Sequence, residues 1–575
     1  MKIKNEFRNV PRFKDIKEII YNSAKLYSDN IAYTTKVVEG QGAKYVSHTY
    51  RELLENINAF GTSLYGLGLK DKRVAVIGYN RYEWVVAHLA NLLGGIVSVP
   101  LDKGLQLEEL EDSLVRSEVE AIVFDEKLEE LLREIIKRGK TKIKHYICME
   151  SLEGFISFYD LVENGRQEIK KKNYEYIEHK VDEMRMSILL FTSGTTSKSK
   201  AVMLNQYGIA TNTYDIQIVE TIYPTDVNIA FLPYHHIFGS TTMLVMLSMG
   251  AKTVFTDGLK YIKQNLLEYK VSVFVGVPAL IDKIYESVQE GIKKQGKTAL
   301  VNTMISISNV LLKLHIDIRK KLFKPIIDQL GGGMRFIISG GAPLDKRTSK
   351  WFNSIGIHLV QGYGLTETSP VISAENDYFV RPGSVGIPMK NVEVEIDNKD
   401  DNGIGEIIVR GSLVMMGYYN DEEQTNEVIK NGWFHTGDLG YIDKDGFIFI
   451  TGRSKDLIVL KNGKKVFPEE IEMILNRIEE IEESLVYGLP EKDDKNDVKV
   501  AVKVVYNEKK INELHDNINE KELRNIIWNK IKELNKTLPK YKYIKELSLT
   551  TEPFVKTSTN KIKRKVEIAK ILEGK

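Results

Sequence analysis

A short run of small hydroxyl residues, a glycine and two lysines is the part of this sequence best suited to chemistry. Thr192–Lys200 reads TSGTTSKSK and directly follows the apolar run SILLF at Ser187–Phe191. On a tight turn after a strand, such residues expose backbone N–H and side-chain O–H donors that can hold phosphate oxygens, and Lys200 adds a positive charge. Composition alone favours a Ser/Thr-rich surface loop. A Walker phosphate loop is excluded, because it needs a glycine where Ser199 stands.

The elements that must position this loop alternate between short β-branched runs and helical patterns. Arg81–Leu93 is predicted to be a helix between two such runs. Strands separated by helices favour parallel α/β sheets. The expected strands are Arg73–Tyr79, Gly95–Pro100, Glu120–Phe124, Ser187–Phe191, Asn228–Leu232, Thr253–Phe255, Val271–Val277 and Met334–Ser339.

The sequence pattern of helices and strands changes twice toward the C-terminus. From about Val392 the sequence becomes β-rich, with acidic turns between the runs VEVEI, GEIIVRG and FIFITG. After a polar break at Gly452–Asp456 (GRSKD), a mixed pattern of about 120 residues is long enough for a small α+β domain. The expected elements there are Lys455–Leu460, helix Pro468–Ile478, strands Ser484–Gly488 and Val498–Val505, and helix Glu520–Leu538. We therefore expect a large domain at 1–452, a small cap at 453–575 and a hinge near 453–456.

Size and charge exclude several classes of protein. The chain has 575 residues, and its 81 basic and 79 acidic residues nearly cancel, so bulk charge does not drive it to nucleic acid. The one cysteine, Cys148, rules out an intrachain disulfide and a multi-thiolate metal site. No apolar run has the length of a signal peptide core or a spanning helix. These features predict a cytoplasmic protein.

An insertion at about Ile281–Leu330 interrupts the α/β pattern. Within it, Leu311–Leu330 (LLKLHIDIRKKLFKPIIDQL) is amphipathic, with basic residues among apolar ones. One interpretation is a docking element for a membrane surface or an acyl carrier protein. The other is the solvated face of a helical insertion.

A series of further motifs follows Thr192–Lys200 in a fixed order. The series resembles the adenylate-forming superfamily of acyl-CoA synthetases, luciferases and peptide-synthetase adenylation domains over roughly Leu189 to Arg564. The insertion with KLFKPI resembles the long-chain fatty acid:CoA ligase branch. The later motifs are LPYHHIFG at Leu232–Gly239, SGGAPL at Ser339–Leu344, QGYGLTETS at Gln361–Ser369, GEIIVRG at Gly405–Gly411, WFHTGDLG at Trp433–Gly440, GRSKD, VFPEEIE at Val466–Glu472 and KTSTNKIKR at Lys556–Arg564.

The resemblance implies a two-step reaction with ATP, Mg²⁺ and CoA. A fatty carboxylate attacks the α-phosphorus of ATP, and CoA then takes the acyl group from acyl-AMP. Glu367 is implied as the Mg²⁺ ligand, Thr366 as a donor to the α-phosphate, Asp438 as the acceptor of the ribose hydroxyls and Tyr363 as the residue beside adenine. The other implied nucleotide-binding residues are Thr192, Ser193, Gly194, Thr195, Thr196, Lys200, Gly341, Ala342, Pro343, Gln361, Gly362, Gly364 and Arg453.

Lys561 is implied as the catalytic cation that bridges the carboxylate and the α-phosphate. His236 and Phe238, with Gly340 and Gly341, are implied at the mouth of an apolar acyl tunnel. The superfamily rotates its small domain between the two steps, and the matching pivot here is Lys455.

The chain departs from the family's phosphate loop at three positions. Ser197 and Ala201 stand where the family usually has glycine, and Ser199 stands where it often has proline. Fewer glycines restrict left-handed backbone angles, so a lower catalytic rate is expected. Two alternatives stay open: a carboxylate ligase with an acyl carrier protein or another acceptor, and a homologue that binds nucleotide or acyl chain without turnover. Peripheral membrane contact is a further candidate interaction, and nucleic acid is not expected.

Overall fold

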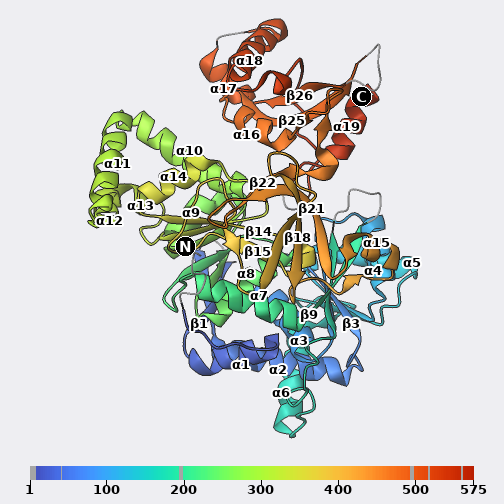
Figure 1. The fold of residues 1–575 in the computed structure, drawn as a ribbon. Coiled ribbons are helices and arrows are strands. Elements are labelled where there is room, and N and C mark those ends of the chain that lie inside the picture. Colours follow the sequence, from blue (N-terminus) through green and yellow to red (C-terminus); the bar gives the residue numbers. More distant parts are fainter. Residues whose placement is uncertain are drawn as a thin grey trace.

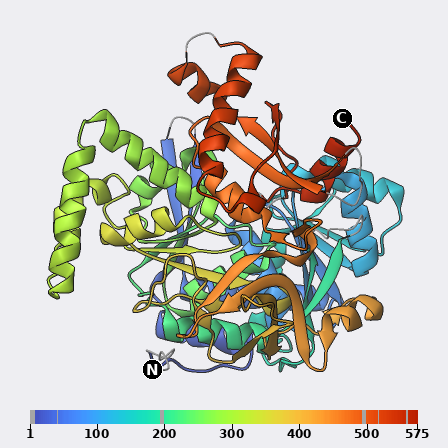
Figure 2. The same ribbon diagram turned by 45° about the horizontal axis from the view of Figure 1, so that its top comes forward.

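The computed structural model describes residues 8–39, 42–192, 199–491, 498–515, 518–557 and 561–574. Within these residues two large sheets and a smaller antiparallel sheet pack around shared helices, and a C-terminal group of elements stands on one side of them (Figure 1 and Figure 2). The fold class is the predicted one, an α/β body with a β-rich part and an α+β C-terminal part.

The first sheet has nine described strands in the order β16-β15-β14-β13-β12-β10-β11-β1-β2. Neighbours from β14 to β1 run parallel, whereas β2, β15 and β16 add antiparallel edges. The bounds are β1 Ile31–Glu39, β2 Gly42–Thr49, β10 Val227–Ala230, β11 Lys252–Phe255, β12 Val273–Gly276, β13 Phe336–Ser339, β14 His358–Gly364, β15 Val371–Ala374 and β16 Ile387–Pro388.

The second sheet has eight described strands in the order β19-β9-β8-β4-β3-β5-β6-β7. Its centre is parallel, and β8 turns back antiparallel into β9 across the predicted phosphate loop. The bounds are β3 Arg73–Ile77, β4 Val97–Leu101, β5 Ala121–Phe124, β6 His145–Cys148, β7 Ile156–Ser157, β8 Met186–Thr192, β9 Lys200–Asn205 and β19 Gly417–Tyr418. The prediction of parallel sheets is thus confirmed for both sheet centres.

Helices cover both faces of the two sheets, as parallel sheets require. One apolar core joins α2, α3, α7 and α8 to strands of both sheets, so these helices form a layer between them. The described helices are α1 Ile16–Leu26, α2 Tyr50–Gly66, α3 Tyr82–Leu93, α4 Leu107–Ser117, α5 Glu129–Arg138, α6 Phe158–Lys170, α7 Gln206–Val219, α8 Ile237–Ser248, α9 Ile262–Tyr269, α10 Pro278–Lys294, α11 Thr298–Lys313, α12 Arg319–Leu322, α13 Lys324–Asp328, α14 Lys346–Ser354, α15 Glu422–Val428, α16 Pro468–Leu475, α17 Glu508–Leu514, α18 Glu520–Asn535 and α19 Arg564–Leu572.

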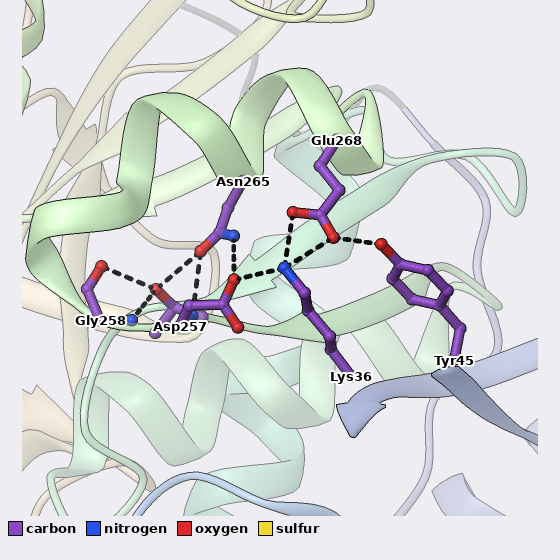
Figure 3. A network of polar contacts seen from close by, with 7 residues as sticks. Lys36, Tyr45, Asp257, Gly258, Asn265 and Glu268 are labelled. Carbon is purple, nitrogen blue, oxygen red and sulfur yellow. Dashed lines mark hydrogen bonds and ion pairs between the residues drawn. The ribbon is translucent and has the colours of Figure 1, made fainter. Parts of the chain in front are cut away.

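A polar network closes the outer edge of the first sheet (Figure 3). Lys36 on β1 pairs with Asp257 and Glu268, each at 3.0 Å, and Tyr45 on β2 donates its hydroxyl to Glu268. Asn265 of α9 donates to Asp257 at 2.7 Å. The β1–β2 hairpin is thereby fastened to α9, and the two carboxylates raise the pKa of Lys36 through hydrogen bonds.

The β-rich part is an antiparallel sheet followed by the C-terminal elements. Its strands are β17 Val392–Asp397, β18 Gly405–Gly411, β20 Ile429–Lys430, β21 Trp433–Ile442 and β22 Ile448–Arg453. The C-terminal strands are β23 Ile458–Val459, β24 Lys465–Val466, β25 Ile481–Pro490, β26 Val498–Tyr506 and β27 Glu546–Thr550, which enclose an apolar core of their own with α16 and α18. The division at 452/453 stays a prediction.

The insertion is less continuous than its pattern indicates. Leu311–Leu330 is divided among the end of α11, the short α12 and the short α13. His315 adopts a positive φ of 62°, and Pro325 opens α13 at its first turn. Since proline lacks the N–H that a helix interior needs, one amphipathic helix cannot run through this segment.

Candidate active site

One cavity of about 2450 Å³ gathers the predicted site residues that the structure describes. Its walls come from both large sheets, from the β17–β22 sheet and from the C-terminal part. Ser193, Gly194, Thr195 and Thr196 lie outside the described residues. The predicted residues that line it are Thr192, Lys200, His236, Phe238, Gly340, Gly341, Ala342, Pro343, Gln361, Gly362, Tyr363, Gly364, Thr366, Glu367, Asp438, Arg453, Lys455 and Lys561.

The carboxyl ends of β13 and β14 form the floor of the cavity. Ser339 pairs with Gln361 in the parallel ladder, so the turn after β13 lies beside β14. Gln361 Oε1 accepts from the backbone N–H of Leu344 at 3.3 Å, which fixes this turn. Gly341 has a φ of +84°, a conformation that favours glycine. Ligands of open α/β sheets bind at such strand ends.

Asp438 on β21 is the centre of a charged cluster. The hydroxyl of Tyr363 donates to Asp438 Oδ2 at 2.6 Å, and Arg453 Nε lies 3.0 Å from Asp438 Oδ1. Asp438 is 4% exposed, so its charge is largely withdrawn from water and needs these partners. A carboxylate has about four lone-pair sites, so both oxygens retain acceptor capacity for hydroxyl groups.

Lys200 and Glu367 lie on either side of Tyr418. Lys200 Nζ is 4.4 Å from the centre of the Tyr418 ring, and the Tyr418 hydroxyl donates to Glu367 Oε1 at 3.0 Å. Burial lowers the pKa of Lys200, and the positive charge of Lys455 lowers it further. Two lysines thus face the same space, which favours an anionic ligand.

Lys561 enters the cavity from the C-terminal part. Its backbone N–H donates to Thr557 Oγ1 at 3.2 Å, and its carbonyl accepts from the Thr557 N–H at 2.9 Å, which closes a hairpin. Three residues further on, Arg564 pairs with the buried Glu472 at 2.7 Å and holds the return arm. Solvent in the cavity reaches the Lys561 side chain, but protein surrounds it; this burial, with the charge of Arg453, lowers the pKa of its amine.

His236 caps the N-terminus of α8 and lines the same cavity. Its Nδ1 accepts from the backbone N–H of Phe238 at 3.3 Å, so the neutral ring carries its proton on Nε2. Burial above all, with the charges of His235 and Lys561, lowers the pKa of His236 to about 3. A Cβ on Gly340 would lie 2.9 Å from the Phe238 ring, so glycine is required for this close packing.

Asp397, Glu406 and His435 form the one described group with the spacing of a metal site. His435 Nδ1 is 2.9 Å from Glu406 Oε2, and the Glu406 Oε1 atom accepts from the Gly437 N–H at 2.9 Å. These contacts fasten the Gly437 turn that carries Asp438, which accounts for the cluster without an ion.

Sequence reasoning missed Tyr418, which contacts both Lys200 and Glu367. Tyr418 lies on the two-residue strand β19, which pairs with β9. It belongs to none of the ordered motifs, and an isolated tyrosine after a glycine carries no spacing signal. Only the pairing of β19 with β9 reveals its position.

Comparisons with known proteins assign the family. The model of the AMP-binding enzyme family matches residues 20–419, and that of the AMP-binding enzyme C-terminal domain matches residues 455–571. The chain therefore belongs to the AMP-binding enzyme family, and the superfamily predicted from the motif order is confirmed.

Two curated relatives and two solved structures show what the chain is similar to. Long chain acyl-CoA synthetase 4 of Arabidopsis thaliana is 29% identical over 79% of this chain and 73% of its own length. Long-chain-fatty-acid–CoA ligase 5 of Rattus norvegicus is 28% identical over 83% and 74%. The anthranilate CoA ligase AuaEII in complex with anthranoyl-AMP has the same fold, with a TM-score of 0.76, 19% identity and 98% and 99% coverage. ATP-bound MatB from Rhodopseudomonas palustris matches with a TM-score of 0.72, 23% identity and 96% and 98% coverage.

The low pKa of His236 predicts a pH-dependent contribution to stability. The folded protein keeps this ring neutral, whereas the unfolded chain binds a proton below about pH 6.5, so stability falls as pH falls through that value. From about pH 8 to about pH 5 the wild type should lose at most about 2 kcal/mol more unfolding free energy than His236→Asn, which keeps an N-cap oxygen.

Urea unfolding at a series of pH values measures this difference. His315→Asn, at an exposed position, is the matched control and should follow the wild type. Equal pH slopes for His236→Asn and the wild type would contradict the assignment of a neutral buried ring.

Proposed function

We propose that this chain is an ATP-dependent long-chain fatty acid:CoA ligase. It joins a fatty carboxylate to the α-phosphorus of ATP, releases pyrophosphate, and passes the acyl group from acyl-AMP to the CoA thiol with release of AMP. The observation that carries the proposal is the shared cavity, in which Lys561 from the C-terminal part meets the Asp438–Arg453 cluster and an apolar chamber beyond His236. The names of the relatives supply the substrate class.

Charge repulsion sets the difficulty of the first step. A fatty carboxylate is ionised at pH 7, so no base is needed, but an anion must approach a polyanion. Two like unit charges at ~4 Å repel by about 4 kcal/mol at an effective dielectric near 20. We assign Lys561 to the carboxylate and α-phosphate, Lys200 to the outer phosphates and Thr366 to the α-phosphate. Bound phosphates would also raise the pKa of both amines again.

The remaining groups hold the nucleotide. Asp438 is assigned to the ribose hydroxyls, Tyr363 and the Gly341–Pro343 turn to adenine, and Arg453 to the junction of ribose and phosphates. Glu367 fits a Mg²⁺ ligand, because its carboxylate faces the cavity and only its Oε1 atom accepts from Tyr418. Bound Mg²⁺ would neutralise phosphate charge.

The second step requires the C-terminal part to move, with Lys455 as the pivot. Among the described residues, three ion pairs join this part to the body near the surface: Arg477 with Asp345 at 3.1 Å, Lys465 with Asp400 at 3.6 Å, and Lys510 with Glu290 at 2.6 Å. Exposed pairs contribute at most about 1 kcal/mol each. Weak pairs of this kind support a rotation that breaks them at little cost.

The insertion is assigned to peripheral membrane contact. Leu300, Ile307 and Val310 of α11 are more than half exposed, and Leu314 at its end is 63% exposed. α11 stands at the edge of the molecule, away from the sheets (Figure 1 and Figure 2). Exposed basic residues accompany this face: Lys293, Lys294, Lys297, Lys313, Lys320 and Lys321. An anionic lipid surface matches apolar residues rimmed by positive charge. In the described part of the chain, no helix combines the length and apolarity needed to span a bilayer.

Exchange of labelled pyrophosphate into ATP tests the proposed activity. With a panel of fatty acids and Mg²⁺, exchange should depend on the acid, and added CoA should yield acyl-CoA and AMP. Exchange without transfer to CoA, but with transfer to a phosphopantetheinyl carrier protein, would assign the chain to carrier-protein ligases instead. Absence of exchange at every chain length would reduce it to a binding protein.

Lys561→Ala should separate the two half-reactions. Because it removes a positive group at the developing charge, adenylation should fall by about 10²–10³-fold. Thioester formation from supplied acyl-AMP and CoA should stay within a few-fold of the wild type. Lys545→Ala, an exposed lysine in the same part of the chain, is the control. Equal loss in both half-reactions would remove Lys561 from its assigned role.

The membrane contact predicts binding to vesicles that contain phosphatidylglycerol. Ile307→Glu combined with Val310→Glu should weaken co-sedimentation by roughly tenfold or more, since each glutamate removes apolar contact and adds like charge. Leu259→Glu, at another exposed leucine, should bind as the wild type does. Unchanged co-sedimentation of the α11 variant would show that this face of α11 is not the membrane-binding surface.

A further inference from the structure

The cavity continues past His236 into a chamber between α8 and the end of α7. On α8, Phe238, Thr241 and Val245 face it at the spacing of one helix face. Met246 also lines it, and the helix rises by ~12 Å from Phe238 to Met246. Strand residues complete the wall: Val275, Ile338 and Val360.

Glu220 lies at the far end of this chamber. It follows α7 directly, and with Ile216 and Val219 it lines the same cavity. Gln217 of α7 donates to Ser248, so the end of α7 lies beside the end of α8. The mouth at His236 is at the opposite end of α8. A chain that enters beside His236 and follows α8 therefore approaches Glu220 with its distal end.

One oxygen of the Glu220 carboxyl group, Oε2, has no hydrogen-bond partner in the described part of the chain. The residue is 3% exposed, and none of the described basic side chains forms an ion pair with it. Arg8 reaches only its backbone carbonyl, at 3.1 Å. Burial raises the pKa of Glu220 well above its ordinary value, and the charges of Asp377 and Glu375 add to this. Both effects favour the neutral carboxylic acid over the carboxylate at this position.

Thr241 provides a second unpaired polar atom in the same wall. Its Oγ1 atom is buried without a partner among the described residues, whereas the neighbouring Thr242 donates to the Phe238 carbonyl at 2.8 Å. Helical threonines ordinarily form that bond to the preceding turn. Buried polar atoms without partners are rare in native proteins because each costs free energy. Glu220 and Thr241 place two such atoms along one chamber, where a polar group on a bound chain would pair with them.

We propose that Glu220 forms a subsite for a hydroxyl group on the distal part of the acyl chain, so that hydroxy fatty acids are the preferred substrates. The inference rests on the proposed function. A neutral carboxylic acid both donates and accepts, which matches a hydroxyl group. A second carboxylate on the substrate would be repelled by Asp377 and Glu375, and a methyl end leaves Glu220 unpaired.

The experiment compares ω-hydroxy and unsubstituted fatty acids of equal length, over a range of lengths, in acid-dependent pyrophosphate exchange with the full chain. The wild type should prefer the hydroxy acid by about tenfold or more in kcat/KM at the length that reaches Glu220, because a site built for a hydroxyl rejects the analogue that lacks it. Glu220→Leu should abolish this preference, so that the hydroxy and unsubstituted acids of that length give similar kcat/KM values. Glu220→Gln, a neutral donor and acceptor, should retain most of it.

Glu55→Leu, the same change at an exposed position on α2, is the control and should behave as the wild type. Infrared difference spectra offer a readout independent of turnover: the hydroxy acid should shift the carboxylic C=O band of the wild type, and Glu220→Gln should lack that band. Exchange with unsubstituted acids at equal or greater efficiency, or an unchanged preference in Glu220→Leu, would overturn this inference while the ligase assignment stands. If none of the acids supported pyrophosphate exchange, both this inference and the ligase assignment would be overturned.

Discussion

The arrangement of this protein depends on the repulsion between a carboxylate and a triphosphate, both negative at neutral pH. The structure offsets this repulsion with a group of cationic side chains that lie close enough to repel one another. Burial above all lowers the pKa values of Lys200 and Lys561, and the charges of Lys455 and Arg453 lower them further. Cationic side chains are thus held close together around the cavity, beside the carboxylates of Glu367 and Asp438. Such a site is destabilised when empty and relieved by an anionic ligand. The clustered positive charge therefore favours binding of the anionic nucleotide.

The two sheets explain how this charge is assembled from distant parts of the sequence. Lys200 begins a strand of the second sheet, Arg453 ends the β17–β22 sheet, and Lys561 arrives on a C-terminal hairpin. Surface ion pairs hold the hairpin's part of the chain, whereas buried pairs hold its internal shape, as Arg564 and Glu472 do. Breaking the former costs little and breaking the latter costs several kcal/mol. The proposed rotation of the C-terminal part would therefore leave Lys561 positioned within that part.

The sequence identified the motifs that line the site, but it did not identify every residue that lines it. Motif order predicted that Asp438, Tyr363 and Lys561 belong to one site, and the structure places all three along one cavity. Each of them stands in a segment with a strong local sequence pattern. It did not find Tyr418 or Glu220, since neither stands in a run whose spacing implies a ligand. The continuous amphipathic pattern of 311–330 was misleading, because periodicity does not register the helix breaks at His315 and Pro325. The lower catalytic rate expected from the altered phosphate loop is less well founded at Ala201. This residue pairs with Phe191 in the β8–β9 ladder, and an extended strand does not need glycine there.

Specificity for a long acyl chain is limited when the chamber offers only apolar contact. Each methylene contributes about 0.8 kcal/mol, so neighbouring chain lengths differ by less than tenfold in binding. With a buried acid at the end of the chamber, substrates are selected by the chemistry of the chain end and not only by chain length. The free-energy cost of an unpaired buried carboxyl group is offset only by a ligand that places a polar group beside it, and a chain with a methyl end leaves that cost in place. Glu220 directly follows α7 and Thr241 lies on α8, two of the helices that pack between the sheets, where an unpaired polar atom is least tolerable. Their retention in this layer is therefore better explained by recognition than by stability.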